Sequence, residues 1–137
     1  MTLSVMEGVA FALRDCMEIA KANGIKVDRS KICGGGAQNP VWRSVAANVL
    51  GIPVDTLVSE EGPAYGAAIL AMTGCGEYKT VKEAAQACVK VKETAYPDSA
   101  LAKAYEKQYS IFKEFYPALK GAYKKMSEVN RNEKASV

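Results

Sequence analysis

The chain has 137 residues; 49% of them are hydrophobic, 24% are charged, and the net charge is +3. This length and balance are typical of one globular domain and exclude a disordered or collagen-like chain. The absence of histidine excludes Ser-His-Asp and Cys-His nucleophile systems and nearly all zinc sites.

The excess positive charge lies at the C-terminal end. Residues 1–119 carry 13 basic and 13 acidic side chains, whereas residues 120–137 carry 5 and 2. The neutral part has no basic stripe, so we expect no nucleic-acid partner. The longest uncharged run, residues 62–76, is too short and too rich in glycine for a membrane span. Because the N-terminus also lacks the features of a signal peptide, we expect a cytoplasmic protein with no membrane partner.

The cysteines form no Cys-x-x-Cys pair, and each lies in an apolar segment: Cys16, Cys33, Cys75 and Cys88. This pattern predicts buried, unpaired thiols in a reducing compartment.

The first element expected along the chain is a helix over about residues 2–23. Its apolar residues recur at steps of three and four, and the predicted buried stripe is Leu3, Met6, Ala10, Leu13, Met17 and Ala20. A short strand at residues 31–33 and a glycine run follow. The next helix starts with Asn39 as its N-cap and Pro40 at its first position, and it ends at Gly51.

A second strand is expected at residues 54–57, followed by a helix over residues 63–72 whose small residues allow close packing. Thr80 and Glu83 form a capping box for a short helix that ends near Cys88. Residues 89–95 give no clear element. A long helix begins at residues 97–98, and Pro117 either kinks it or starts a new helix to about residue 129. The alternation predicts parallel strands with helical crossovers, and two strands suggest the back half of an α/β domain.

The segment most informative about function is Ile32–Trp42, in which a strand runs through three glycines into a helix N-terminus. Glycine leaves bare backbone for a ligand, and the first amides of a helix favour an anion. The pattern is neither a P-loop nor a dinucleotide-binding fingerprint, and on spacing alone a tight packing turn is equally favoured. A second small-residue turn, residues 61–71, follows the second strand, so the two turns would define a crevice for a ligand.

Together, residues 7–15, 34–43 and 62–68 resemble the C-terminal domain of the FGGY carbohydrate kinases, and the xylulokinases in particular. The resemblance implies the C-terminal part of an actin-like, ribonuclease H-like ATPase domain, an α/β fold that is helix-rich with a short parallel sheet. It divides the chain into a partial kinase domain, residues 1–119, and a charged helix end and tail, residues 120–137.

The resemblance also implies transfer of the γ-phosphoryl group of ATP, with Mg²⁺, to a sugar, here D-xylulose. Other family members act on ribulose, gluconate or glycerol, and a non-catalytic module of the same fold is a further alternative. The sugar would be bound mainly by an N-terminal part that lies outside this sequence. We therefore expect the chain alone to be inactive, and its open sheet edge to favour a homodimer or self-association.

The residues that the resemblance assigns to ATP or ADP are those of the glycine turn: Gly34, Gly35, Gly36, Ala37 and Asn39. The backbones of residues 35–37 would lie against the nucleotide, and the Asn39 side chain would reach its adenine or ribose. Gln38 is expected to face solvent.

No residue of the chain is assigned to catalysis or to a metal. Asp15, Asp28 and Asp55 lack the family's catalytic context. Asp15 is instead expected to be a solvated or interdomain charge, and Glu61 to lie in a surface turn.

Overall fold

The computed structural model of the chain describes residues 1–59 and 62–134, with side chains as far as residue 129. The elements follow in the order α1 (Thr2–Ala22), β1 (Ser30–Ile32), a 3₁₀ turn η1 (Gly35–Gln38), α2 (Pro40–Leu50), β2 (Val54–Leu57), α3 (Gly62–Gly74), α4 (Val81–Cys88), β3 (Val91–Ala95) and α5 (Ser99–Lys134). Among these residues, no helix is long and apolar enough to span a membrane.

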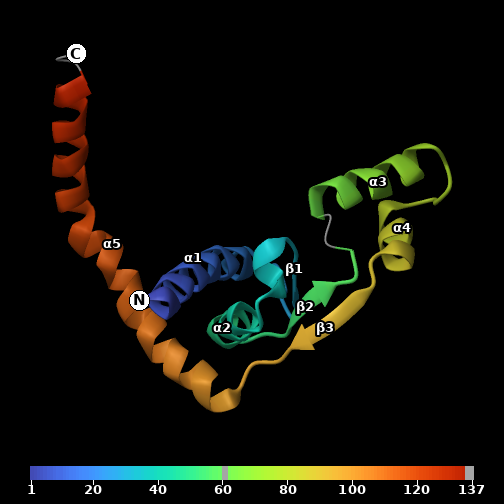
Figure 1. Cartoon of the computed structure of the whole chain (residues 1–137), viewed down its shortest axis with the longest axis horizontal. Coiled ribbons are helices and arrows are strands. Elements are labelled where there is room, and N and C mark those ends of the chain that lie inside the picture. Colours follow the sequence, from blue (N-terminus) through green and yellow to red (C-terminus); the bar gives the residue numbers. More distant parts are fainter. Residues whose placement is uncertain (60–61, 135–137) are drawn as a thin grey trace.

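The sheet has three strands in the order β1-β2-β3. The predicted parallel pairing of the first two strands is confirmed, with Ile32 opposite Thr56. The prediction of a parallel sheet is wrong for the third strand, because β3 pairs with β2 in antiparallel fashion and places Thr94 opposite Asp55. The chain returns to the sheet through α3 and α4, and the resulting sheet is mixed (Figure 1).

Helix α2 is the centre of the fold because it is apolar on two faces. One face packs on the sheet, in a cluster built from Ala46, Ala47 and Val54 with Ile32, Leu50 and Ala95 around it. The other face packs on α1 and α5, in a cluster of Ala10, Phe11, Val45, Val49 and Tyr109. The ends of α2 match the prediction: Asn39 caps the first turn, and Gly51 adopts the left-handed conformation with φ 66°.

The ring of Phe11 is the centre of the contact between α1 and α5. Its centroid lies 6.0 Å from those of Tyr105 and Tyr109 and 5.2 Å from that of Phe112. The predicted α1 stripe is therefore only partly correct. Met6, Ala10 and Met17 face inward, but Leu3 and Leu13 are about half exposed because the buried face is turned toward Phe11.

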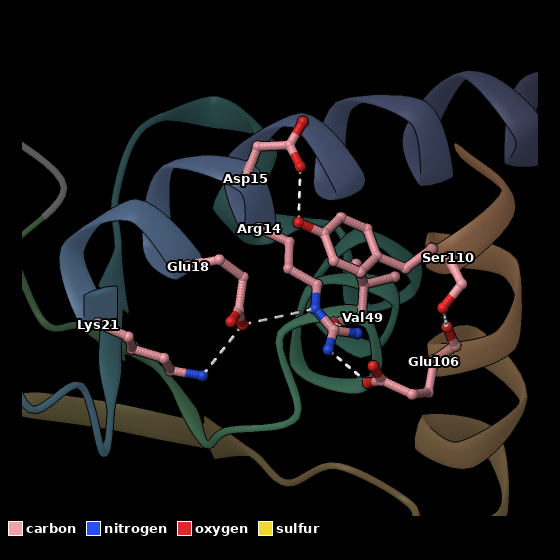
Figure 2. A network of polar contacts seen from close by, with 8 residues as sticks. Arg14, Asp15, Glu18, Lys21, Val49, Glu106 and Ser110 are labelled. Atoms are coloured by element: carbon pink, nitrogen blue, oxygen red, sulfur yellow. Dashed lines mark hydrogen bonds and ion pairs between the residues drawn. The ribbon is translucent and has the colours of Figure 1, made fainter. Parts of the chain in front are cut away.

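A polar network joins the same helices at the edge of this cluster (Figure 2). The Arg14 guanidinium on α1 donates to the backbone carbonyl of Val49 at the end of α2, at 3.1 Å, and to the carboxylate of Glu106 on α5. Its carbon also lies 4.3 Å from the centroid of the Tyr109 ring. One side chain thus ties three helices together.

Helix α5 packs on the body only along its first half. Beyond Phe112 its apolar side chains are about half exposed or more: Phe115, Tyr116, Leu119, Tyr123, Met126 and Val129. Pro117 lies inside one continuous helix rather than starting a new one, and Figure 1 shows that the helix changes direction along its length. A proline removes one backbone hydrogen bond and is a common cause of such bends. Residues 135–137 of the predicted tail lie outside the described residues.

Two further expectations about burial are wrong. All four cysteines are free, but Cys16, Cys33 and Cys75 are exposed and Cys88 is only half-buried. Cys33 and Cys75 lie just beyond the ends of β1 and α3, outside the packed elements. The small residues of α3 are also mostly exposed: α3 packs on α4, and a side chain at Gly66 would meet nothing within 4 Å.

Candidate functional site

The glycine turn connects the end of β1 to the start of α2. Gly34 has φ 85°, a conformation that side chains rarely adopt, and it redirects the chain into η1. Two backbone hydrogen bonds close the turn: Ala37 N–H donates to the Gly34 carbonyl at 2.9 Å, and Asn39 N–H donates to the Gly36 carbonyl at 3.1 Å. The first two amides of η1, those of Gly35 and Gly36, have no carbonyl within the turn to bond.

Asn39 joins the turn to α2 through its side chain. Its Oδ1 accepts hydrogen bonds from Val41 N–H at 2.9 Å and from Trp42 N–H at 3.4 Å. The predicted N-cap is therefore confirmed. Because the cap uses only the oxygen, the Nδ2 group remains a donor, and among the described residues it has no acceptor.

The predicted site residues differ in what surrounds them. A side chain built at Gly34 or Gly35 would meet nothing within 4 Å, so the space beside both is open. At Gly36 it would lie 3.7 Å from the Trp42 ring. Ala37 is buried, whereas Gln38 is exposed as expected.

A hollow of about 240 Å³ lies beside the turn, at the carboxyl ends of both parallel strands. Its wall is formed by Ile32, Cys33, Gly34, Ala37, Gln38, Arg43, Thr56, Leu57, Ser59, Lys92 and Glu93. The hollow lies where the sequence predicted a ligand crevice, between the turns that follow the two strands. The second turn reaches it closely, because a side chain at Gly62 would lie 2.7 Å from the Cys33 sulfur. Glu61, expected in this turn, lies outside the described residues.

Arg43 connects the turn to the third strand, and nothing in the local pattern pointed to it. Its Nη1 donates to the carbonyls of Ala37 at 2.9 Å and Gln38 at 3.0 Å. Its Nη2 donates to Oε2 of Glu93 on β3 at 2.9 Å. Sequence reasoning missed Lys92 and Glu93 as well, because it did not place β3.

The aspartates that sequence reasoning set aside lie away from the hollow. Asp55 is fully buried, and its carboxylate accepts from Arg29 at 2.7 and 3.0 Å and from the Thr94 hydroxyl at 2.7 Å. Burial raises the pKa of this carboxyl, but the hydrogen bonds from Arg29 and Thr94 and the charge of Arg29 outweigh burial and hold the pKa below its usual value. Asp15 accepts a hydrogen bond from the Tyr109 hydroxyl at 2.6 Å. Among the described residues, no group of three or more acidic or cysteine side chains gathers to hold a metal.

The family model for the C-terminal domain of the FGGY family of carbohydrate kinases matches residues 1–75, which contain the glycine turn and both parallel strands. The chain belongs to this family. As an FGGY chain it has part of an actin-like, ribonuclease H-like ATPase fold, as the sequence predicted apart from the mixed sheet.

Relatives of this FGGY chain agree with the assignment. It is 33% identical to a xylulose kinase of Staphylococcus epidermidis over 117 residues, which cover 85% of this chain and 24% of the relative. It is 32% identical to a xylulose kinase of Escherichia coli with the same coverage. The chain therefore spans about a quarter of the length of these relatives.

Two solved structures from Lactobacillus acidophilus are similar over 89% of this chain and 25% of their own, each at 25% identity. They are a ligand-bound xylulose kinase, with a TM-score of 0.75, and a gluconate kinase, with a TM-score of 0.79.

Proposed function

We propose that this chain supplies the nucleotide-facing wall of a sugar kinase, and that the whole protein transfers the γ-phosphoryl group of ATP to D-xylulose. The observation that carries the proposal is the open, Asn39-capped glycine turn beside a hollow at the ends of two parallel strands. In open α/β sheets, ligands bind outside the carboxyl ends of the strands. The xylulose kinases among the relatives support the choice of sugar.

In this proposal the nucleotide lies over Gly34, Gly35, Gly36 and Ala37 and is contacted through their backbones. Gly35 and Gly36 contribute bare amides at the positive end of a helical turn, and the open space beside Gly34 and Gly35 leaves room for the ligand. Asn39 then has two roles that do not compete. Its oxygen caps α2, and its Nδ2 donates to the adenine or ribose.

The chain contributes binding rather than chemistry. Mg²⁺ and a base for the sugar hydroxyl are needed for phosphoryl transfer, and the described residues form no acidic cluster that could hold the ion. The metal would enter with the nucleotide phosphates, and the base and sugar pocket would come from outside this chain. Residues 1–119 form the nucleotide-binding part in this proposal, and residues 120–137 form the charged helix end.

Gluconate is a second candidate for the sugar, because the similar structures include a gluconate kinase with a TM-score of 0.79. The two candidates share the nucleotide site and differ in the part of the protein that contacts the sugar. Assays of the whole protein with D-xylulose and with gluconate distinguish them by which sugar gives ADP release.

Isothermal titration with ADP tests the nucleotide site in the chain itself. Gly35→Leu fills the open space beside the turn without a strained backbone and should reduce ADP affinity at least about tenfold. Gly8→Leu is the matched control, because Gly8 on α1 also faces open space but lies far from the turn in sequence. Equal ADP affinity in both variants would contradict the assignment. Absence of ADP binding by the parent chain would favour the non-catalytic module.

A further inference from the structure

We propose that Arg43 is a positioning residue for the nucleotide site, holding the glycine turn in its binding conformation through the carbonyls of Ala37 and Gln38. The inference rests on the proposed function of the turn and adds a residue of the hollow's wall that acts on the site through the backbone of the turn. It starts from the three contacts of the guanidinium: two backbone carbonyls of the turn and a carboxylate of β3.

The turn needs such a support because its own interactions are few. It is one 3₁₀ turn rich in glycine, and glycine loses more conformational freedom on ordering than any other residue. The carbonyls of Ala37 and Gln38 would each bond the amide four residues later if the helix extended backward. Those amides, of Val41 and Trp42, donate instead to Asn39. Arg43 donates to both carbonyls in place of those amides.

Arg43 is suited to this role by its shape and its surroundings. Its side chain is only 18% exposed, and one nitrogen of its planar fork serves both carbonyls while the other reaches Glu93. The Glu93 side chain is 57% exposed, so the ion pair itself adds little stability. Its effect is to fix the direction of the guanidinium and so to connect the turn to β3.

A second effect acts on the amide side of the same peptide groups. A cation that bonds a carbonyl polarises the peptide group, so the N–H of the following residue becomes a better donor. Arg43 bonds the peptide group that carries the Gln38 N–H and the one that carries the Asn39 N–H. Its charge therefore strengthens the hydrogen bond from the Asn39 N–H to the Gly36 carbonyl that closes the turn.

Three variants test the inference. Arg43→Met removes all three contacts, Arg43→Lys keeps the charge without the planar fork, and Glu93→Gln weakens only the link to β3. Trp42 is the single tryptophan of the chain, and its ring faces Gly36. Its fluorescence therefore reports the conformation of the turn without nucleotide, and amide hydrogen exchange of residues 35–39 reports its order.

We expect Arg43→Met to change Trp42 emission, to speed exchange in the turn, and to weaken ADP binding about tenfold. In Arg43→Lys and Glu93→Gln, the Trp42 emission, the exchange rate of the turn and the ADP affinity should lie between those of Arg43→Met and those of the parent. Arg29→Met is the matched control, because Arg29 bonds Asp55 rather than the turn. It should lower the melting temperature and leave Trp42 emission and ADP affinity unchanged.

Unchanged emission and exchange in Arg43→Met would overturn the inference, and so would unchanged ADP affinity. An Arg43→Met variant that loses ADP affinity only because it unfolds would show a collapsed melting transition. In that case the deciding variant is Glu93→Gln, which keeps the carbonyl contacts. Normal Trp42 emission and normal ADP affinity in Glu93→Gln would overturn the link to β3. A parent chain that binds no ADP contradicts the proposed function instead. The fluorescence and exchange measurements separate these failures because they need no nucleotide.

Discussion

At the residue scale, Asp55 shows how a carboxylate is kept in the interior of this small sheet. It is fully buried, and its oxygens accept from Arg29 beside β1 and from Thr94 on β3. Arg29 itself is half exposed. The aspartate therefore links the three strands, and its negative charge is compensated by a cation that remains in contact with water.

Replacing Asp55 with asparagine should lower the free energy of unfolding by about 1–3 kcal/mol, because a charged acceptor of three hydrogen bonds is lost in a buried place. The folded pKa of Asp55 lies below its unfolded value, so the carboxylate stabilises the fold above the unfolded pKa of about 4. The difference between parent and Asp55→Asn should narrow as the pH falls through the folded pKa. Urea unfolding at neutral and acidic pH measures it, and a difference that widens in acid would contradict this account.

Tyr105 and Tyr109 predict a loss of stability in alkali. Burial, together with hydrogen bonds to Glu7 and Asp15 respectively, raises the pKa of each phenol to about 12. In the unfolded chain the phenols ionise near pH 10. Because the folded pKa is the higher one, the stabilisation is complete below pH 10 and is lost as the pH rises toward 12.

Tyrosinate absorbance during an alkaline titration, followed alongside unfolding, measures this effect. Tyr109→Phe should remove one late-ionising group and flatten the alkaline fall in stability. Tyr116→Phe, at an exposed position on α5, is the control and should not change the fall. Ionisation of all seven tyrosines in one step before unfolding would show that the buried hydrogen bonds do not protect these phenols.

At the element scale, α5 consists of a packed half and an exposed half. Tyr109 is buried and Phe112 packs on the Phe11 ring, whereas Tyr123, Met126 and Val129 are each more than half exposed. A chain that ends at Lys120 should keep its free energy of unfolding within about 0.5 kcal/mol. A chain that ends at Gln108 should not fold, because loss of each large core side chain costs about 3–5 kcal/mol of a total of about 5–15.

Circular dichroism melts of the two truncated chains measure this prediction. A large loss of stability in the longer one would mean that the exposed half of α5 contacts the body in solution. Intact folding of the shorter one would mean that α1 and α2 form a sufficient core without α5.

The elements that sequence reasoning predicted correctly have local signals. Asn39 and Pro40 mark the start of α2, and Gly51 marks its end. Thr80 and Glu83 mark the start of α4. Strand β3 has no such signal. Its residues, Val-Lys-Glu-Thr-Ala, include two charges, and the first three are exposed, so nothing in the sequence distinguishes the segment from a loop until β2 pairs with it.

The candidate site was likewise predictable only where its residues are close together in the sequence. The glycine turn is contiguous in sequence, and its residues could be named without a structure. Arg43 and Glu93 are 50 residues apart and meet only because β3 lies next to β2. The burial of α1 was misjudged for a related reason: Phe11 is the inward residue because α5 brings three rings to it, and spacing along α1 does not show this.

At the scale of the whole molecule, the chain leaves apolar surface uncovered on more than one helix. On α1 the side chains of Leu3, Val5, Val9, Leu13 and Ile19 are about half exposed or more. Exposed apolar surface of this kind favours association, and β1 adds an open strand edge. We therefore expect the chain to self-associate at high concentration.

Light scattering over a concentration series tests this expectation, and a monomer throughout would contradict it. The double variant Val5→Lys and Val9→Lys separates the two causes. It should reduce association if the α1 surface is responsible, and it should leave association unchanged if the edge of β1 is responsible. The chain that ends at Lys120 tests the exposed half of α5 in the same way, because it should associate less if that half is responsible.

The last prediction is that the chain alone phosphorylates no sugar. Phosphoryl transfer depends on positioning and charge stabilisation: a base near the sugar hydroxyl, a bound Mg²⁺, and a cleft that closes over both substrates. In the proposed function the chain offers only one wall of a nucleotide site. Its buried aspartate is engaged by Arg29, and its described residues gather no metal ligands.

A coupled assay of ADP release with MgATP and D-xylulose, on the purified chain, tests this prediction. The result expected is no sugar-dependent turnover. The remaining three quarters of an FGGY xylulose kinase, added in trans, should restore activity in proportion to reassembly of the two parts. Turnover by the chain alone at an ordinary kinase rate of roughly 1–100 per second would mean that the base and the metal site lie within these 137 residues. In that case the division of labour proposed here would be wrong.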